Sequence, residues 1–129
     1  MSELVNLIRA ADDFCSLGAA KPSLIQEAET HLGVAFANDF KEYALEFGAA
    51  TFNGRELTGI CRSDRLNVVS VTERARAFYS NFPRSAYVVE ELLFDHILII
   101  QDSDGCIYSY GPQDRATQIA KSLREYLFK

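Results

Sequence analysis

Residues 25–48 read IQEAETHLGVAFANDFKEYALEFG and contain two short amphipathic helix patterns in succession. The apolar residues of the first pattern share one helix face: Ile25, Ala28 and Leu32. Those of the second recur at i, i+3, i+4 and i+7: Phe40, Tyr43, Ala44 and Phe47. Gly33 and Gly48 follow the two patterns, where a left-handed residue commonly ends a helix. The stretch therefore predicts a pair of helices, each closed by a glycine.

The starts of these two helices are also marked. Ser23 precedes the first pattern and Gln26 stands three residues later, the spacing of a capping box, which satisfies two free amides. Asp39 and Glu42 lie near the start of the second pattern, where the helix dipole favours negative charge. We therefore expect Ser23 to cap the first helix and the second helix to begin close to Asp39.

The same segment resembles the signature of the SUKH superfamily, the Smi/Knr-like domains. The residues that fill the signature positions are Glu29, Leu32, Gly33, Phe36, Asp39, Phe40, Tyr43, Phe47 and Gly48. Ala37 stands where the family usually has proline, which would pre-set the first helical turn. The resemblance implies a bacterial immunity protein, which binds and silences a cognate protein toxin.

Length and composition indicate one soluble domain. The 129 residues can bury a sizeable core, so we expect a single domain over 1–129, with 1–22 as a leading helix and linker. No apolar run approaches the ~20 residues of a membrane helix, and the N-terminus has no signal pattern. A cytoplasmic protein without membrane contact is expected. The cysteines Cys15, Cys61 and Cys106 are odd in number and widely spaced, which predicts reduced, mostly buried thiols.

The net charge of −5 is unevenly distributed along the chain. Residues 1–54 carry −5 and residues 84–114 carry −5, whereas 55–83 carry +2 and 115–129 carry +3. No stretch forms a basic stripe, and phosphate contacts need clustered Lys and Arg. Direct binding of nucleic acid is therefore not expected.

Residues outside the helix pair predict further helices and several strands. Helices are expected over 3–17, from Ser70 through Tyr79, and from Asp114 or Thr117 to the C-terminus. The last helix is expected to bury Ile119, Leu123, Tyr126 and Leu127. Strands are expected over 51–62, around an Asn53-Gly54 turn, and over 67–69, 87–89, 96–101 and 106–110.

The strand over 96–101 is the strongest because four consecutive branched residues, 97–100, indicate burial on both faces and a central place in a sheet. Residues 102–105, Asp-Ser-Asp-Gly, form the turn to its partner strand. The predicted class is α+β: N-terminal helices, then a mostly antiparallel sheet with a C-terminal helix packed on it. This order also resembles the SUKH arrangement.

No catalytic, metal or cofactor site is predicted. His31 and His96 are the only histidines, and a thiol–imidazole nucleophile with Cys61 or Cys106 is disfavoured because reactive cysteines need an electropositive setting. The 102–105 turn resembles the start of a calcium loop, but Gln113 stands where an EF-hand needs glutamate. Glu29 is either an acid catalyst or, as we favour, a structural acceptor.

The acidic block of residues 84–114 is the predicted surface for a protein partner. The candidate partner-binding residues are Glu90, Glu91, Asp95, Asp102, Asp104, Tyr108 and Tyr110. Tyrosine offers a large contact area at low entropic cost, although the two tyrosines also fit a strand pair packed under the C-terminal helix. An acidic surface would be steered toward the basic cleft of a nuclease or deaminase toxin.

Three functions remain open from the sequence. The leading hypothesis is an immunity protein that neutralises a cognate toxin without catalysis. The alternative is a regulatory protein–protein interaction module or scaffold of the Smi/Knr-like type. An enzyme acting on a small molecule ranks last because paired catalytic residues are missing from the sequence pattern.

Overall fold

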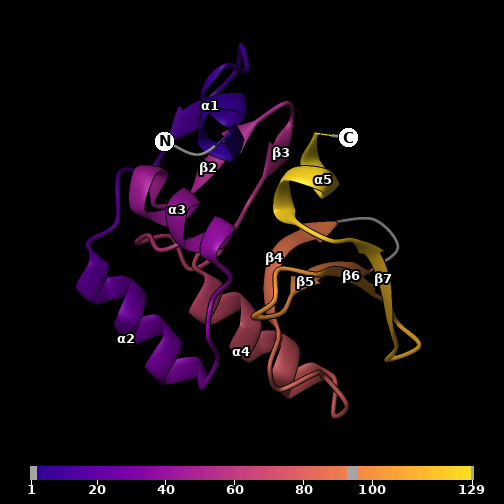
Figure 1. Ribbon diagram of the computed structural model, residues 1–129. Coiled ribbons are helices and arrows are strands. Elements are labelled where there is room, and N and C mark those ends of the chain that lie inside the picture. Colours follow the sequence, from indigo (N-terminus) through magenta and orange to yellow (C-terminus); the bar gives the residue numbers. More distant parts are fainter. Residues whose placement is uncertain (1–2, 93–95, 129) are drawn as a thin grey trace.

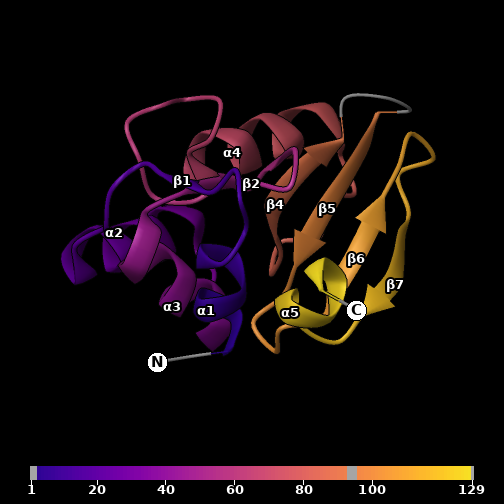
Figure 2. The same ribbon diagram turned by 90° about the horizontal axis from the view of Figure 1, so that it is seen from above.

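The chain folds into a mixed α+β structure in which helices pack on both faces of the larger of two antiparallel sheets. The computed structural model describes residues 3–92 and 96–128. Its helices are α1 (Glu3–Arg9), α2 (Pro22–Leu32), α3 (Asn38–Phe47), α4 (Val68–Phe78) and α5 (Leu123–Leu127). Figures 1 and 2 show α1, α2 and α3 together on one side and the larger sheet on the other. The α+β expectation is confirmed.

Two antiparallel sheets accompany these helices. The smaller has the order β1-β2-β3, with bounds Cys15–Ser16, Ala50–Phe52 and Arg55–Glu56. The larger has the order β4-β5-β6-β7, with bounds Tyr87–Leu92, Ile97–Gln101, Ile107–Tyr110 and Ala116–Ala120. The central position predicted for the 96–101 strand is confirmed, because β5 lies between β4 and β6. The Asn53-Gly54 turn also joins β2 to β3 as predicted, and both residues have positive φ.

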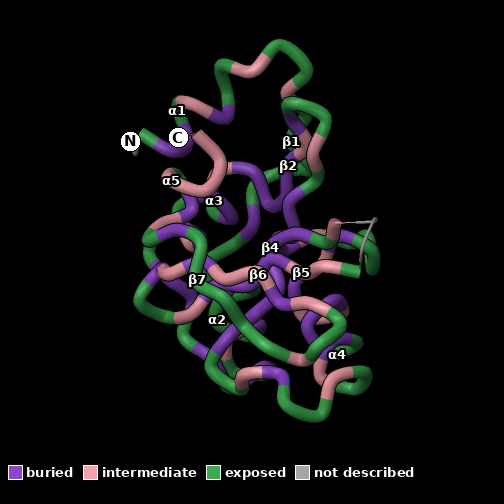
Figure 3. The backbone as a smooth tube through the Cα atoms, turned by 90° about the vertical axis from the view of Figure 1, so that its right-hand side faces the viewer, coloured by how far each residue is buried: buried purple, intermediate pink, exposed green. Residues whose placement is uncertain are grey.

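The larger sheet is covered on both faces. On one face, Val88, Ile100 and Tyr110 pack with Val71 and Ala75 of α4 in a cluster of buried residues. The other face belongs to a larger cluster that also takes in buried residues of α1, α2, α3 and α5, namely Leu4, Ile25, Phe40 and Leu123 among others. Figure 3 shows the buried segments running through the middle of the molecule. The sheet therefore separates two apolar layers.

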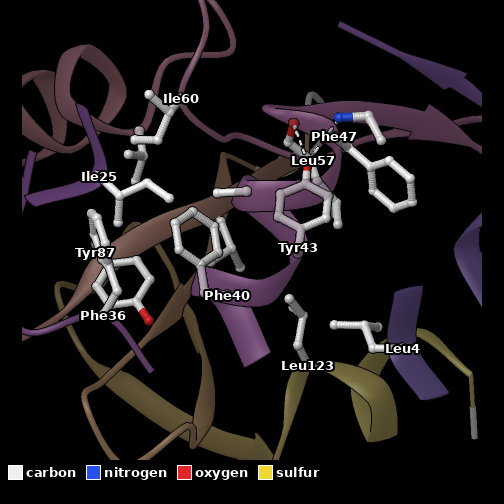
Figure 4. Close-up of a cluster of buried hydrophobic side chains, with 14 of the residues drawn as sticks. Leu4, Ile25, Phe36, Phe40, Tyr43, Phe47, Leu57, Ile60, Tyr87 and Leu123 are labelled. Atoms are coloured by element: carbon white, nitrogen blue, oxygen red, sulfur yellow. Dashed lines mark hydrogen bonds between the residues drawn. The ribbon is translucent and has the colours of Figure 1, made fainter. Parts of the chain in front are cut away.

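Aromatic side chains of the predicted helix pair form the centre of the larger cluster. Phe36 packs edge-on against Tyr87 at 4.8 Å between ring centroids, and Phe40 lies 5.1 Å from the same ring. The hydroxyl of Tyr43 donates to the carbonyl of Leu57 and accepts from the N–H of Ala50 (Figure 4). Because these contacts join α3 to the strands, the helix pair fixes the position of both sheets.

Three segments approach so closely behind α3 that they require glycine. A Cβ on Gly59 would lie 1.9 Å from the carbonyl oxygen of Gly48, and one on Gly48 would lie 2.0 Å from that of Gly18. Real Cβ atoms are not found at such distances, so neither position tolerates a side chain without backbone movement. Gly48 also ends α3 with a φ of 70°, as the sequence predicts.

The first helix is shorter than predicted. It ends at Arg9, and residues 15–16, expected to be helical, form β1 and pair with Ala50 and Thr51. The carboxylate of Asp13 accepts hydrogen bonds from the backbone N–H groups of Asn53 and Gly54. The chain leaves the helix because this segment is used to cap and extend the β2–β3 hairpin.

Two helix starts were also predicted wrongly. Helix α2 begins at Pro22 with Lys21 as its N-cap residue, so Ser23 lies inside the first turn; proline is favoured there because its missing N–H is not needed. Helix α4 begins after Asn67, not Ser70, because the Asn67 side chain accepts from the amides of Val69 and Ser70. The strand predicted over 67–69 is therefore the helix start, apart from an isolated bridge between Gly59 and Asn67.

The C-terminal helix was predicted too early. Residues 116–120 form β7, paired with β6, and α5 begins after Ser122, whose hydroxyl accepts from the N–H of Glu125. Ile119, predicted to be buried in that helix, is 38% exposed on β7, whereas Leu123 is fully buried in α5. Pairing with β6 outweighs the weak helix pattern of this segment.

The cysteine prediction was wrong about burial. Cys15 is exposed, and Cys61 and Cys106 are half-buried; all three are free thiols. Partial burial raises the pKa of the Cys61 thiol. Among the described residues, no helix is long and apolar enough to cross a membrane.

Candidate functional site: an acidic cleft beside β4

The predicted partner-binding residues do not form one surface. Glu90 and Glu91 lie in the second half of β4, whereas Asp102 and Asp104 lie in the turn after β5. The strand β5 separates these two groups along its length. Asp95 lies outside the described residues. The acidic block predicted from the sequence is therefore divided between opposite ends of the sheet.

Glu90 was predicted to be a surface residue, and this is wrong. It is 4% exposed, and its Oε1 accepts a 2.6 Å hydrogen bond from the Tyr126 hydroxyl of α5. Its Oε2 lies 3.8 Å from Nε of Arg55. A register shift between Val88 and Glu90 pairs Glu90 with Ile99 and brings it to the sheet face that α5 covers. Glu90 is an internal carboxylate that holds α5 and β3 to the sheet.

Tyr110 is also buried, at 1% exposure, and its ring packs 5.1 Å from Tyr79 and 5.4 Å from Phe82. It cannot anchor a partner. Tyr108 is half-buried and packs against the same cluster, so the predicted common face is confirmed. That face lies under α4 and not under the C-terminal helix as the alternative interpretation held.

The turn between β5 and β6 is built around Asp102. Its Oδ1 accepts from the amides of Asp104 and Cys106, and its Oδ2 accepts from the Tyr108 hydroxyl at 2.9 Å. This last bond, first among several causes, raises the pKa of Tyr108 to about 12. The predicted hairpin turn is confirmed, and Asp102 is occupied with holding it. Asp104 is the exposed carboxylate of this turn, whereas Asp102 is half-buried.

A cleft of about 790 Å³ lies between the β2–β3 hairpin and the second half of β4. The residues that line it are Asp13, Thr51, Phe52, Asn53, Gly54, Arg55, Glu56, Thr58, Arg65, Leu66, Glu90, Glu91 and Leu92. The hairpin and β4 meet at Thr58, whose N–H donates to the carbonyl of Val89. Beyond that junction the cleft lies between the hairpin and β4.

The charged groups of the cleft are held in place by the protein itself. Arg65 forms a paired hydrogen bond with the carboxylate of Glu56, which lowers the pKa of Glu56. Backbone hydrogen bonds from Asn53 and Gly54 lower the pKa of Asp13. Arg55 lies over the Tyr126 ring, 5.3 Å from its centroid. These contacts hold both acidic and basic side chains in place along the wall of the cleft.

Four carboxylates and two guanidinium groups line the cleft, which gives it a formal charge of −2. The hydrogen bond to Glu56 raises the pKa of Arg65, and the charge of the exposed Glu91 adds a smaller effect in the same direction. Glu90 and Glu91 of this cleft were predicted from the sequence, whereas Asp13, Glu56, Arg55 and Arg65 were not. Of these four, only Arg55 and Glu56 adjoin the Asn53-Gly54 turn in the sequence; Asp13 and Arg65 carried no local signal, since the cleft joins segments far apart in the chain.

A second cavity, of about 740 Å³, lies between α2, the 17–20 segment and the 60–63 segment. Its lining is largely apolar and includes the exposed side chains of Leu17 and Leu24. At its rim His31 contacts Glu73 at 2.7 Å. No group of His, Cys, Asp and Glu side chains in the described part of the chain is arranged to hold a metal ion.

The signature residues serve the fold. Oε2 of Glu29 accepts from the N–H of Phe36 at 2.8 Å and lies 3.6 Å from Nζ of Lys41, so the structural interpretation of Glu29 is confirmed. The carboxylate of Asp39 accepts from the Gln101 side chain and from the N–H of Leu123 at the start of α5. These carboxylates connect elements of the domain to one another.

The structure is thus an α+β fold with a charged cleft that is a candidate binding site. A family model described as SUKH_5, SMI1-KNR4 cell-wall, matches residues 1–129. The chain belongs to this family, the Smi/Knr-like group that the signature indicated. Among curated proteins, none matches the sequence.

Proposed function

We propose that this protein is an immunity protein, which binds a cognate toxin domain and blocks its active site without chemistry of its own. Family membership supports a binding role. The observation that carries the proposal is the acidic cleft beside β4, because its carboxylates are positioned before any partner arrives. A preformed negative site suits the basic nucleic-acid cleft of a nuclease or deaminase toxin.

The cleft offers a basic side chain two kinds of contact. Glu91 stands exposed at its wall, and the Glu56 carboxylate is half of an ion pair with exposed partners. An incoming lysine or arginine can share these oxygens without desolvating a buried charge, which keeps the cost of binding low. The negative field would also speed the encounter, and salt would screen that effect.

A regulatory interaction module is the second candidate. The description of the matching family refers to the cell wall, which favours a role in organising envelope synthesis. This function predicts several weak partners, whereas an immunity function predicts one partner bound tightly.

Co-expression with the C-terminal domain encoded by the neighbouring reading frame tests the proposal. We expect the wild-type chain to restore growth of cells that express the domain, and the purified pair to form a tight complex. Growth arrest despite a folded, soluble wild-type chain would reject the immunity function, and several weak partners captured in its place would support the regulatory module.

Charge reversal then tests the cleft. Glu91→Lys should slow association by roughly three- to tenfold at low salt and by less at high salt. Glu42→Lys is the matched control, because Glu42 is an exposed carboxylate on α3, away from the cleft. Asp104→Lys measures the other part of the predicted acidic block. An association rate that falls for Glu42 or Asp104 but not for Glu91 would place the interface elsewhere.

A further inference from the structure

The two edges of the larger sheet differ. The edge at β4 is partly covered, because the N–H and hydroxyl of Thr58 donate to the carbonyls of Val89 and Val88. The edge at β7 pairs only with β6 in the described part of the chain. Figure 2 shows β7 at the outer margin of the sheet, on the side away from α1, α2 and α3. In an antiparallel edge strand, alternate residues direct their N–H and C=O groups outward, so β7 presents backbone hydrogen-bonding groups at this edge, although the carbonyl of Ala120 already accepts from the Gln118 side chain at 3.4 Å.

The strand itself has little to prevent another strand from pairing with it. Residues 116–120 read ATQIA, without a charge or a proline, and the first four are exposed (Figure 3). One protective feature is present: a register shift between Ile107 and Tyr108 leaves Ile119 as an extra residue on β7. Another strand could therefore pair regularly mainly with residues 116–118.

Basic residues stand at both ends of this edge. Arg115 precedes β7 and Lys121 follows it, and both are exposed. The acidic residues nearest to them in the sequence bind backbone amides: Asp114 accepts from the N–H of Asn81, and Glu125 accepts from the N–H of Lys121. The edge is therefore an uncharged strand with an exposed basic side chain at each end, beside a half-buried carboxylate.

A second copy of the chain is a poor partner for this edge. In the antiparallel register of full overlap, Ala116 would lie opposite the partner's Ala120, which places Arg115 opposite the partner's Lys121. Like charges directly opposite each other destabilise a strand pair. The same two charges favour a strand that carries a carboxylate near each end.

We propose that β7 accepts an extended segment of a partner protein as a fifth strand, with acidic side chains about six residues apart facing Arg115 and Lys121. The main-chain hydrogen bonds would supply affinity, and the two end charges would select the segment. This inference rests on the proposed function for the identity of the partner, since the partner would be the toxin that also contacts the acidic cleft.

Two synthetic peptides test the edge without the toxin. Each has seven residues with alternating threonine and valine in the middle, and the ends are glutamate in one and lysine in the other. Titrated into the isotope-labelled chain, the glutamate peptide should shift the amide signals of 116–120 and slow their hydrogen exchange. It should bind about tenfold more tightly than the lysine peptide, as expected from two opposed charge pairs.

The double variant Arg115→Glu and Lys121→Glu should reverse the order of the two peptides. Both positions are exposed, so its melting temperature should match that of the wild type. Equal affinity for the two peptides, signal shifts centred elsewhere, or no shift up to millimolar peptide would each overturn the proposal. So would a concentration-dependent dimer that protects 116–120 in the wild-type chain. No toxin is present in these peptide experiments. Their result therefore does not depend on the result of the growth-rescue test, and a failure of one can be told apart from a failure of the other.

Discussion

The phenolic oxygen of Tyr87 accepts a 2.9 Å hydrogen bond from the backbone N–H of Ala37. The same hydroxyl donates to Oε1 of Gln101 at 2.8 Å, within a fully buried environment. Burial, the largest cause, raises the pKa of Tyr87, so the hydroxyl keeps its proton. Ala37 occupies the position where the family signature has proline, and proline has no N–H to donate. Alanine at this position therefore supplies a donor that the tyrosine uses.

Removing either partner should reveal this dependence. Tyr87→Phe leaves the Ala37 amide buried without an acceptor, which should lower the free energy of unfolding by about 1–3 kcal/mol. Ala37→Pro alone should have a smaller effect, because the backbone there already has a φ of −65°. In the Tyr87→Phe background the proline should become stabilising, since it removes the orphan donor. Urea unfolding of the four proteins measures this, and additive effects would contradict the coupling.

The hairpin cap formed by Asp13 should make stability depend on pH. Its pKa is held below the ordinary value by the hydrogen bonds from Asn53 and Gly54, so the folded state favours the charged form. This contribution is present above the unfolded pKa of about 3.9 and is lost as the pH falls through the lower folded pKa. Asp13→Ala should therefore melt below the wild type at pH 7, and the difference should shrink toward pH 2.5. Asp12→Ala is the control, since Asp12 is the adjacent exposed carboxylate. A difference that stays constant with pH would rule out the cap as its cause.

Glycine at position 59 should be irreplaceable. Gly59→Ala would force a Cβ against the Gly48 backbone, and we expect a loss of about 3 kcal/mol or failure to fold. Gly111→Ala is the matched control because no atom lies within 4 Å of a Cβ built there. Its stability should stay within about 0.5 kcal/mol of the wild type. Thermal melts of both variants test this prediction. Equal melting temperatures would contradict it, because they would show that the backbone can move to accommodate the added Cβ atom.

A charged side chain introduced into the central strand β5 should lower stability by different amounts at different positions. Ile99 is 2% exposed, so Ile99→Asp buries an unpaired carboxylate at a cost of several kcal/mol, comparable with the stability of a whole domain. Leu98 is half-buried on the opposite face, and Leu98→Asp should leave a folded protein of lower stability. Circular dichroism during heating distinguishes the two. A near-wild-type melt for Ile99→Asp would contradict the placement of β5.

Local sequence patterns correctly predicted those helices and strands that are determined by residues close together in the sequence. The periodicity of Phe40, Tyr43 and Phe47 predicted α3, and the branched run of 97–100 predicted the central strand. The end of α1 could not be read in this way, because it depends on Asp13 meeting a hairpin 40 residues away. Likewise, 116–120 became a strand because β6 lay beside it, although its short apolar pattern also fits a helix.

The candidate site was less predictable than the fold. Charge counting identified residues 84–114 as acidic, but a register shift in β4 turned Glu90 inward while Glu91 stayed exposed. The cleft also needs Arg65 and the β2–β3 hairpin, which no spacing in the sequence connects to β4. A site assembled from distant segments leaves no local pattern, whereas a turn such as 102–105 does.

The inward role of Glu29 and Asp39 has a practical consequence for the family. Each carboxylate serves a backbone amide of its own chain, so neither constrains what the domain recognises. The framework is therefore separable from the proposed recognition surface. Transplanting the cleft wall and the ends of β7 from one member onto another should transfer the choice of partner and leave the melting transition in place.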